Sequence, residues 1–169
     1  MSLPEPEFVT ELLAPAHLLD AFDSGEQETD LWLRNNALRT QRQGSARTRV
    51  LRRSGDMRVL GFYAVTPHDT FRDGLPGSAA GGLSVVPGYL IAQLAVDRSL
   101  QGQGMGAELL RDALETVVVA AGAAGGRLVV VDAIHERALR FYERFGFVRI
   151  GQTLRLYMKI SRLQGSLAT

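Results

Sequence analysis

The feature that most constrains the fold is the stretch LQGQGMGAELL, residues 100–110, which places three glycines within five positions. The run before it, YLIAQLAV at 89–96, is almost continuously apolar, which is typical of a central strand buried on both faces. After it, apolar residues recur at helical spacing from 105 to 121. Each glycine in a helix costs about 0.5–1 kcal/mol relative to alanine, so this junction needs bare backbone. Free amides at a helix N-terminus are typical of a phosphate site.

The N-terminal part of the chain predicts a helix followed by a hairpin. Ser24 and Gln27 fit a capping box, and an apolar face on Leu31 and Leu38 indicates a helix from about 26 to 41. Residues 48–65 contain two β-rich runs around a Ser-Gly-Asp turn.

The remaining segments complete an alternating pattern. Residues 67–88 contain five glycines and three prolines, and we expect a long mobile loop there. A buried strand is expected at 127–131, an amphipathic helix at 134–145 stopped by Gly146, and two closing strands within 147–160. We therefore expect an α/β fold, one domain spanning 1–169 with a core at about 8–160, and a central mixed sheet flanked by helices.

Composition excludes several function classes. The 169-residue chain is 46% hydrophobic and 22% charged, as expected of one globular domain. It has no cysteine, which excludes disulfides and thiolate catalysis, and its three histidines have no metal-ligand spacing, so we expect no metal. We find no signal peptide and no apolar run near the roughly 20 residues of a membrane span. We expect a cytoplasmic protein that does not engage a membrane.

Charge is strongly polarised along the chain. Residues 1–30 contain eight acidic residues and no lysine or arginine, whereas residues 34–58 contain eight arginines against Asp56 alone. Such a basic block is consistent with contacts to nucleic-acid phosphates. An equally valid interpretation is a solvated face balanced by the acidic N-terminus.

Three phosphate motifs compete for the glycines. A Walker A loop requires a lysine that this segment lacks. The dinucleotide pattern is matched by Gly102, Gly104 and Ala107, with Asp132 ending the next strand, but only 37 residues follow Asp132, too few for that fold. A purely structural glycine turn stays open as an alternative.

The third motif is Q/R-x-x-G-x-G/A, present as Gln101, Gly104 and Gly106. Residues 138–147, ALRFYERFGF, match a second pattern, A-x-x-F-Y-x-x-x-G-F. With both motifs in order, the chain resembles the GNAT N-acetyltransferases over its whole length. The resemblance implies a splayed strand pair in the sheet, and acetyl-CoA as co-substrate without a metal.

The resemblance also assigns roles to residues. Backbone amides would hold the pyrophosphate along the loop Gln101, Gly102, Gln103, Gly104, Met105, Gly106 and Ala107. The splayed strand end, Leu94, Ala95 and Val96, would pair with the pantetheine arm, and the Val96 N–H would polarise the thioester carbonyl. Tyr142 would protonate the leaving thiolate, although a packed aromatic is the alternative for this residue. No general base is marked, since His135 at a strand–helix junction is equally well explained as a cap.

The segment FDSGEQETDLWLRNNAL, with Phe22, Asp23, Gly25, Asp30 and Trp32, resembles the start of acetyltransferase toxins from bacterial toxin–antitoxin pairs. This resemblance implies a homodimer, direct attack by the α-amine of aminoacyl-tRNA in a ternary complex, and a ribbon-helix-helix antitoxin. The tRNA phosphates would contact Arg47, Arg49, Arg52 and Arg53. The alternatives are a GNAT enzyme for a small-molecule or protein amine, and an acyl-CoA-binding regulatory domain without catalysis.

Overall fold

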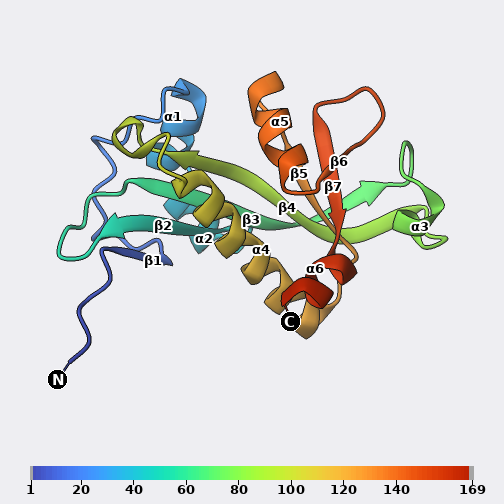
Figure 1. The fold of residues 1–169 in the computed structure, drawn as a ribbon, viewed down its shortest axis with the longest axis horizontal. Helices are drawn as coiled ribbons and strands as arrows, with labels where there is room; N and C mark the ends of the chain where they lie inside the picture. The colour runs from blue at the N-terminus through green and yellow to red at the C-terminus, as the bar shows by residue number, and fades with distance from the viewer. Residues whose placement is uncertain (1, 168–169) are drawn as a thin grey trace. The chain divides into compact units, whose positions relative to one another are not determined.

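A computed structural model describes residues 2–167, and its seven strands form one mixed sheet in the order β1-β2-β3-β4-β5-β7-β6 (Figure 1). The strands are β1 (Phe8–Leu12), β2 (Arg47–Arg53), β3 (Gly61–Phe71), β4 (Val85–Val96), β5 (Leu128–Asp132), β6 (Val148–Arg149) and β7 (Arg155–Lys159). The helices are α1 (Gln27–Asn35), α2 (Ala37–Arg42), α3 (Gly77–Ala80), the 3₁₀ turn η1 (Arg98–Leu100), α4 (Met105–Ala124), α5 (Glu136–Arg144) and α6 (Ile160–Leu167). The expected α/β class, a mixed sheet flanked by helices, is confirmed.

The described chain divides into two compact units. The first runs up to Val65 and includes Gln93–Asp112, and the second contains Thr66–Ala92 and the chain from Ala113 onward. That the whole chain acts as a single domain stays a prediction.

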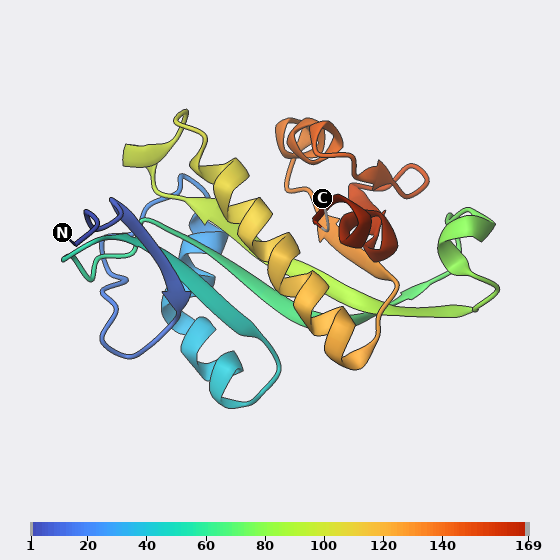
Figure 2. The same ribbon diagram turned by 60° about the horizontal axis from the view of Figure 1, so that its bottom comes forward.

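In the first unit, strand alternation places two sets of side chains on opposite faces of the sheet. Val50 pairs with Phe62, and both join the buried cluster that holds Leu33 of α1 and Ala37 of α2. The neighbouring residue Tyr63 faces the other way, and its hydroxyl donates to Asp112 of α4 at 2.6 Å. Helices α1 and α2 therefore cover one face of β2 and β3, and the first turns of α4 cover the other (Figure 2).

In the second unit, β5 is the buried centre. Its residues Leu128–Val131 are buried, as the sequence predicts for this strand. It pairs with β7 antiparallel and with β4 in parallel. Gly88 permits the β4–β5 contact, because a Cβ there would lie 2.0 Å from the Leu128 carbonyl oxygen.

Two local predictions near the N-terminus are wrong. The expected 26–41 helix is interrupted at Asn36, a residue whose side chain competes with helical hydrogen bonds. Ser24 does not cap α1, whose N-cap position is Glu26; the Ser24 hydroxyl instead accepts from the Glu26 N–H and donates to Asp30.

The expected loop at 67–88 is largely regular structure. Strand β3 continues to Phe71, β4 begins at Val85, and α3 lies between them. The segment is ordered because Ala79, Ala80 and Val86 are buried in the core of the second unit.

Burial of residues 89–96 is also not as predicted. Only Ile91 of this run is buried, although β4 has strands on both sides. The β4–β5 pairing ends at Ile91 with Val131, and β4 continues to Val96 without it. The end of β4 therefore has no pairing partner in β5, which itself ends at Asp132, and the expected splayed pair stays a prediction.

Candidate active site

The glycine loop presents a row of unpaired amides at the start of α4. Gly102 and Gly104 have φ of 78° and 82°, and a Cβ on either would meet nothing within 4 Å. The Glu108 N–H donates to the Gly104 carbonyl, and within residues 2–167 no partner accepts from the six preceding N–H groups, 102–107. Orphan amides at a helix N-terminus, on backbone in an open turn, form a site for phosphate oxygens.

The end of β4 offers backbone groups on the side away from β3. The Asp97 N–H donates to the Leu60 carbonyl next to β3, at 2.8 Å. Because backbone groups alternate along a strand, Leu94 and Val96 direct theirs to the opposite side. That is the side on which the pairing with β5 has ended, so an extended ligand has the N–H and C=O of Leu94 and the N–H of Val96 to pair with, whereas the Val96 carbonyl accepts from Gln101.

The Gln101 side chain holds the start of the glycine loop against neighbouring backbone. Its side-chain amide donates to the Ser24 carbonyl at 2.8 Å and to the Val96 carbonyl at 2.9 Å. The sequence motif groups Gln101 with the cofactor-binding residues, whereas in the structure its side chain fixes the backbone that precedes the open amides.

Tyr142 lies on α5 in the second unit and is 7% exposed. Its ring packs edge-on against Phe141 and Phe147, with centroid distances of 5.3 and 5.7 Å. Burial raises the pKa of Tyr142 to about 12, and the nearby Asp132 carboxylate acts in the same direction. Among the described residues the hydroxyl has no hydrogen-bond partner, yet it is not one of the fully enclosed polar atoms. The hydroxyl is therefore a protonated donor that reaches the surface.

His135 serves as the N-cap of α5. Its Nδ1 accepts the Ala138 N–H at 3.1 Å, which fixes the first turn of the helix that carries Tyr142. The structure thus supports the cap interpretation of this histidine.

A polar cluster that sequence reasoning missed lies at the end of β5. Arg155 binds Asp132 through two hydrogen bonds of 2.7 Å and contacts His68 Nε2 at 3.1 Å. Burial and the Arg155 charge lower the pKa of His68, and because a guanidinium only donates, Nε2 accepts and the neutral ring carries its proton on Nδ1. An open pocket of about 390 Å³ adjoins the cluster. Its lining residues are Thr70, Phe71, Asp73, Asp132, Ile150, Thr153, Leu154 and Arg155.

Three of the four arginines proposed for tRNA binding contact carboxylates. Arg49 contacts Asp112, Arg52 contacts Glu11, and Arg53 contacts Glu7. For Arg52 and Arg53 this supports the balanced-face interpretation, because both partners come from the acidic N-terminal segment, Glu11 in β1 and Glu7 just before it.

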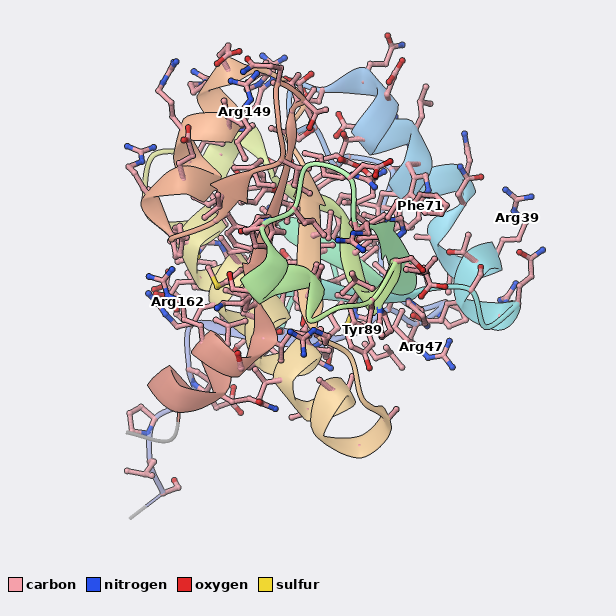
Figure 3. The ribbon with its side chains drawn as sticks, turned by 90° about the vertical axis from the view of Figure 1, so that its right-hand side faces the viewer. Arg39, Arg47, Phe71, Tyr89, Arg149 and Arg162 are labelled. Atoms are coloured by element: carbon pink, nitrogen blue, oxygen red, sulfur yellow. The ribbon has the colours of Figure 1, made fainter. Side chains whose placement is uncertain are left out.

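Other arginines of the same block have no carboxylate partner. Within residues 2–167 these are Arg34, which donates to the Phe22 carbonyl, and Arg39, Arg42 and Arg47, at the end of α2 and the start of β2. Arg39 and Arg47 project outward from the ribbon (Figure 3). The described residues contain no cluster of three metal-ligating side chains, and none of their helices is both long and apolar enough to span a bilayer.

The fold, together with the open amides at the start of α4, is that of an acyl-CoA-dependent acetyltransferase. Residues 49–149 match the acetyltransferase (GNAT) domain, and the chain belongs to this family. A tRNA-acetylating toxin of Mycobacterium tuberculosis is 41% identical over 140 residues, covering 79% of this chain and 83% of the toxin. The resemblance to the GNAT toxins is thereby confirmed.

Solved structures give the same relationship. The toxin AtaT complexed with acetyl-methionyl-tRNAfMet has a TM-score of 0.87 and 30% identity, covering 96% of this chain and 99% of AtaT. A tyrosine-to-phenylalanine mutant of AtaT, bound to acetyl-CoA and to the C-terminus of the antitoxin AtaR, has a TM-score of 0.84 and 28% identity, covering 97% and 100%.

Proposed function

We propose that this chain transfers the acetyl group of acetyl-CoA to the α-amine of an aminoacyl-tRNA, and that it acts as a toxin by removing charged tRNA from translation. The observation that carries this proposal is the row of open amides at 102–107 after the end of β4 that has no β5 partner, in a chain 41% identical over 140 residues to a tRNA-acetylating toxin. The acetyl-CoA and antitoxin seen with AtaT support the same donor and an antitoxin of its own for this chain. A homodimer, a cytoplasmic location and the ribbon-helix-helix class of the antitoxin stay predictions.

The donor side of the reaction uses backbone groups. The amides of 102–107 hold the pyrophosphate, and Leu94 and Val96 pair with the pantetheine arm as an added strand would. The Val96 N–H then donates to the thioester oxygen as negative charge develops on it.

The transfer step uses direct attack by a neutral amine, without a dedicated general base, and one general acid. The neutral amine attacks the carbonyl carbon, the C–N bond forms, and the C–S bond breaks with its electron pair leaving on sulfur. Tyr142 donates its proton to that sulfur and regains one from solvent, and the amine nitrogen loses its proton to water. An aminoacyl ester amine titrates well below lysine, so the absence of a dedicated base is tolerated.

The acceptor side is proposed from charge. Arg39, Arg42 and Arg47 are the exposed arginines of the basic block that have no carboxylate partner among the described residues, and phosphates suit them. In the second unit, the pocket is lined by Asp73 and by the Asp132–Arg155 ion pair, and its apolar residues Phe71, Ile150 and Leu154 suit an aminoacyl group.

The test uses purified protein, labelled acetyl-CoA, charged tRNA, uncharged tRNA and a panel of free amines and peptides. We expect label on charged tRNA alone, and arrest of growth when the protein is induced in a bacterial host. Label on small amines or peptides but never on charged tRNA, with harmless expression, would establish an ordinary GNAT enzyme instead.

A further inference from the structure

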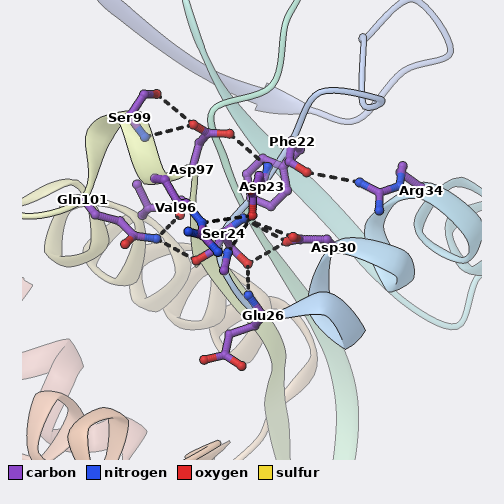
Figure 4. Close-up of polar contacts among 12 residues, drawn as sticks. Phe22, Asp23, Ser24, Glu26, Asp30, Arg34, Val96, Asp97, Ser99 and Gln101 are labelled. Carbon is purple, nitrogen blue, oxygen red and sulfur yellow. Dashed lines mark hydrogen bonds and ion pairs between the residues drawn. The ribbon is translucent and has the colours of Figure 1, made fainter.

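The segment Phe22–Asp30, which marks the resemblance to the toxins, has no role in the chemistry described above. It runs into the first turn of α1 in the first unit and lies against the end of β4 and the turn η1 (Figure 4). Its hydrogen bonds connect residues more than 70 positions apart in the sequence. We therefore ask whether this connection positions the residues of the acetyl-CoA site.

Hydrogen bonds join this segment to residues 97–101, which lead into the glycine loop. The Asp23 carbonyl accepts the Arg98 N–H at 2.9 Å, and the Asp23 N–H donates to the Asp97 carboxylate at 3.0 Å. The Ser24 carbonyl accepts from the Gln101 side chain, which also holds the Val96 carbonyl. The segment thus contacts Asp97, which directly follows the last residue of β4, and Gln101, the first residue of the glycine loop.

Asp97 stabilises this junction as a carboxylate. Burial opposes its charge, but hydrogen bonds from the Asp23 N–H, and from the N–H and hydroxyl of Ser99, lower the pKa of Asp97 overall. The junction is therefore fixed by charged hydrogen bonds, which are stronger than neutral ones.

Asp30 holds Ser24 in place. This aspartate is 6% exposed, and it accepts the Ser24 hydroxyl at 2.6 Å and the Ser24 N–H at 3.1 and 3.2 Å. A carboxylate this buried persists only where hydrogen bonds replace its water. Here the hydrogen bonds to Asp30 come from Ser24, and the Ser24 carbonyl in turn accepts from the Gln101 side chain.

We infer that Asp30 and Gln101 are positioning residues for acetyl-CoA: through Ser24, whose carbonyl accepts from Gln101, Asp30 fixes the start of the glycine loop against the end of β4, so that the loop amides converge on the pyrophosphate. Neither side chain contacts the donor. Each acts by ordering backbone before the donor arrives, so that binding does not have to order it. The inference rests on the use of acetyl-CoA, which family membership supplies, and not on the identity of the acceptor.

The test compares two donors in two variants. Acetyl-CoA carries the pyrophosphate, whereas acetyl-pantetheine carries the same thioester and arm without it. We expect Asp30→Asn and Gln101→Met each to raise the KM for acetyl-CoA roughly tenfold, with kcat at saturation nearly unchanged. With acetyl-pantetheine, kcat/KM should stay within about twofold of wild type. Calorimetry with free CoA should show the same loss of affinity without any acceptor.

The matched control is Asp56→Asn, since Asp56 also accepts a backbone N–H, that of Arg58, in a turn outside the site. Equal losses on both donors in Asp30→Asn and Gln101→Met would make the series a support of the fold alone, and no loss on either would also overturn the inference. Gln101 is exposed, so its variant is expected to fold even where Asp30→Asn does not. A wild-type protein that fails to bind CoA would instead contradict the assigned donor.

Discussion

At the scale of single residues, Tyr142 combines a packed ring with a reactive hydroxyl. The aromatic contacts hold the ring, and burial keeps the hydroxyl protonated well above neutral pH. The two interpretations that the sequence left open for this residue are therefore compatible: the core fixes the ring, and the hydroxyl stays available as an acid.

Tyr142→Phe separates these two contributions. The ring contacts survive, so acetyl-CoA affinity and thermal stability should stay close to wild type. Without the proton donor, turnover should fall by about 10²–10⁴-fold. Single-turnover kinetics with calorimetry measures both, and wild-type turnover would assign Tyr142 to packing alone.

At the scale of elements, the glycine loop depends on open space above Gly104. A side chain there meets no protein atom but enters the volume that the phosphates need. Gly55 is a matched control, because its φ is 81° against 82° for Gly104 and its Cβ position is equally open. The pair separates backbone strain from loss of the ligand site.

Gly104→Val and Gly55→Val should therefore lose similar stability in thermal unfolding. Only Gly104→Val should lose acetyl-CoA binding, measured by calorimetry. A folded Gly104→Val protein with wild-type affinity would remove the loop from the site.

Strand β1 is attached to β2 by charge as well as by backbone pairing. Glu11 accepts from Arg52 at 2.5 Å and contacts His17 Nε2 at 2.8 Å, and hydrogen bonds from Arg52 and then His17 lower the pKa of Glu11 to about 2. Because the folded-state pKa lies below the unfolded value of 4.5, this stabilisation is fully present above pH 4.5 and is lost as pH falls toward 2.

Glu11→Gln should lower Tm at pH 7, and the difference from wild type should shrink between pH 4.5 and pH 2. Thermal unfolding followed by circular dichroism across that range measures it. Glu5→Gln, in the segment before β1, is the control and should match wild type throughout. A Glu11→Gln deficit that persists unchanged near pH 2 would contradict the ion-pair explanation.

Elements with strong periodicity could be predicted from the sequence, and long-range polar contacts could not. Helix α4 and strand β5 follow from apolar spacing alone. Strand β1 is not predicted, because the β2 backbone with which it pairs and the Arg52 side chain that binds Glu11 lie about 40 positions away in the sequence. In the site, the glycines and Tyr142 lie in local motifs, whereas Gln101 reaches a carbonyl 77 residues earlier and His68 meets Arg155 across 87. Sequence spacing carries no signal for such pairs.

At the scale of the whole molecule, the proposed recognition of tRNA depends on arginines that are not already paired with carboxylates. Carboxylates already neutralise Arg49, Arg52 and Arg53, so the exposed arginines around α2 are better placed for phosphates. Each phosphate contact releases counterions, which makes binding depend on salt.

Arg42→Gln with Arg47→Gln should raise the KM for charged tRNA and leave acetyl-CoA affinity unchanged. The slope of log affinity against log salt should fall by roughly 0.9 for each contact removed. Filter binding across a salt series measures that slope. The matched double variant Arg52→Gln with Arg53→Gln should keep the wild-type slope. If this variant lowers the slope and Arg42→Gln with Arg47→Gln does not, the phosphate contacts lie on β2 instead.

Because the β4–β5 pairing ends at Ile91, the last residues of β4 have backbone groups without a partner in β5. The amide exchange rates of these residues should reflect this. Amides of Leu94 and Val96 point where no strand continues, whereas the Asp97 amide is bonded to Leu60. In heavy water the first two should exchange quickly and the third slowly. An arriving pantetheine arm should slow the first two alone, so two adjacent deuteration rates would report occupancy of the donor site in a protein that has not yet turned over.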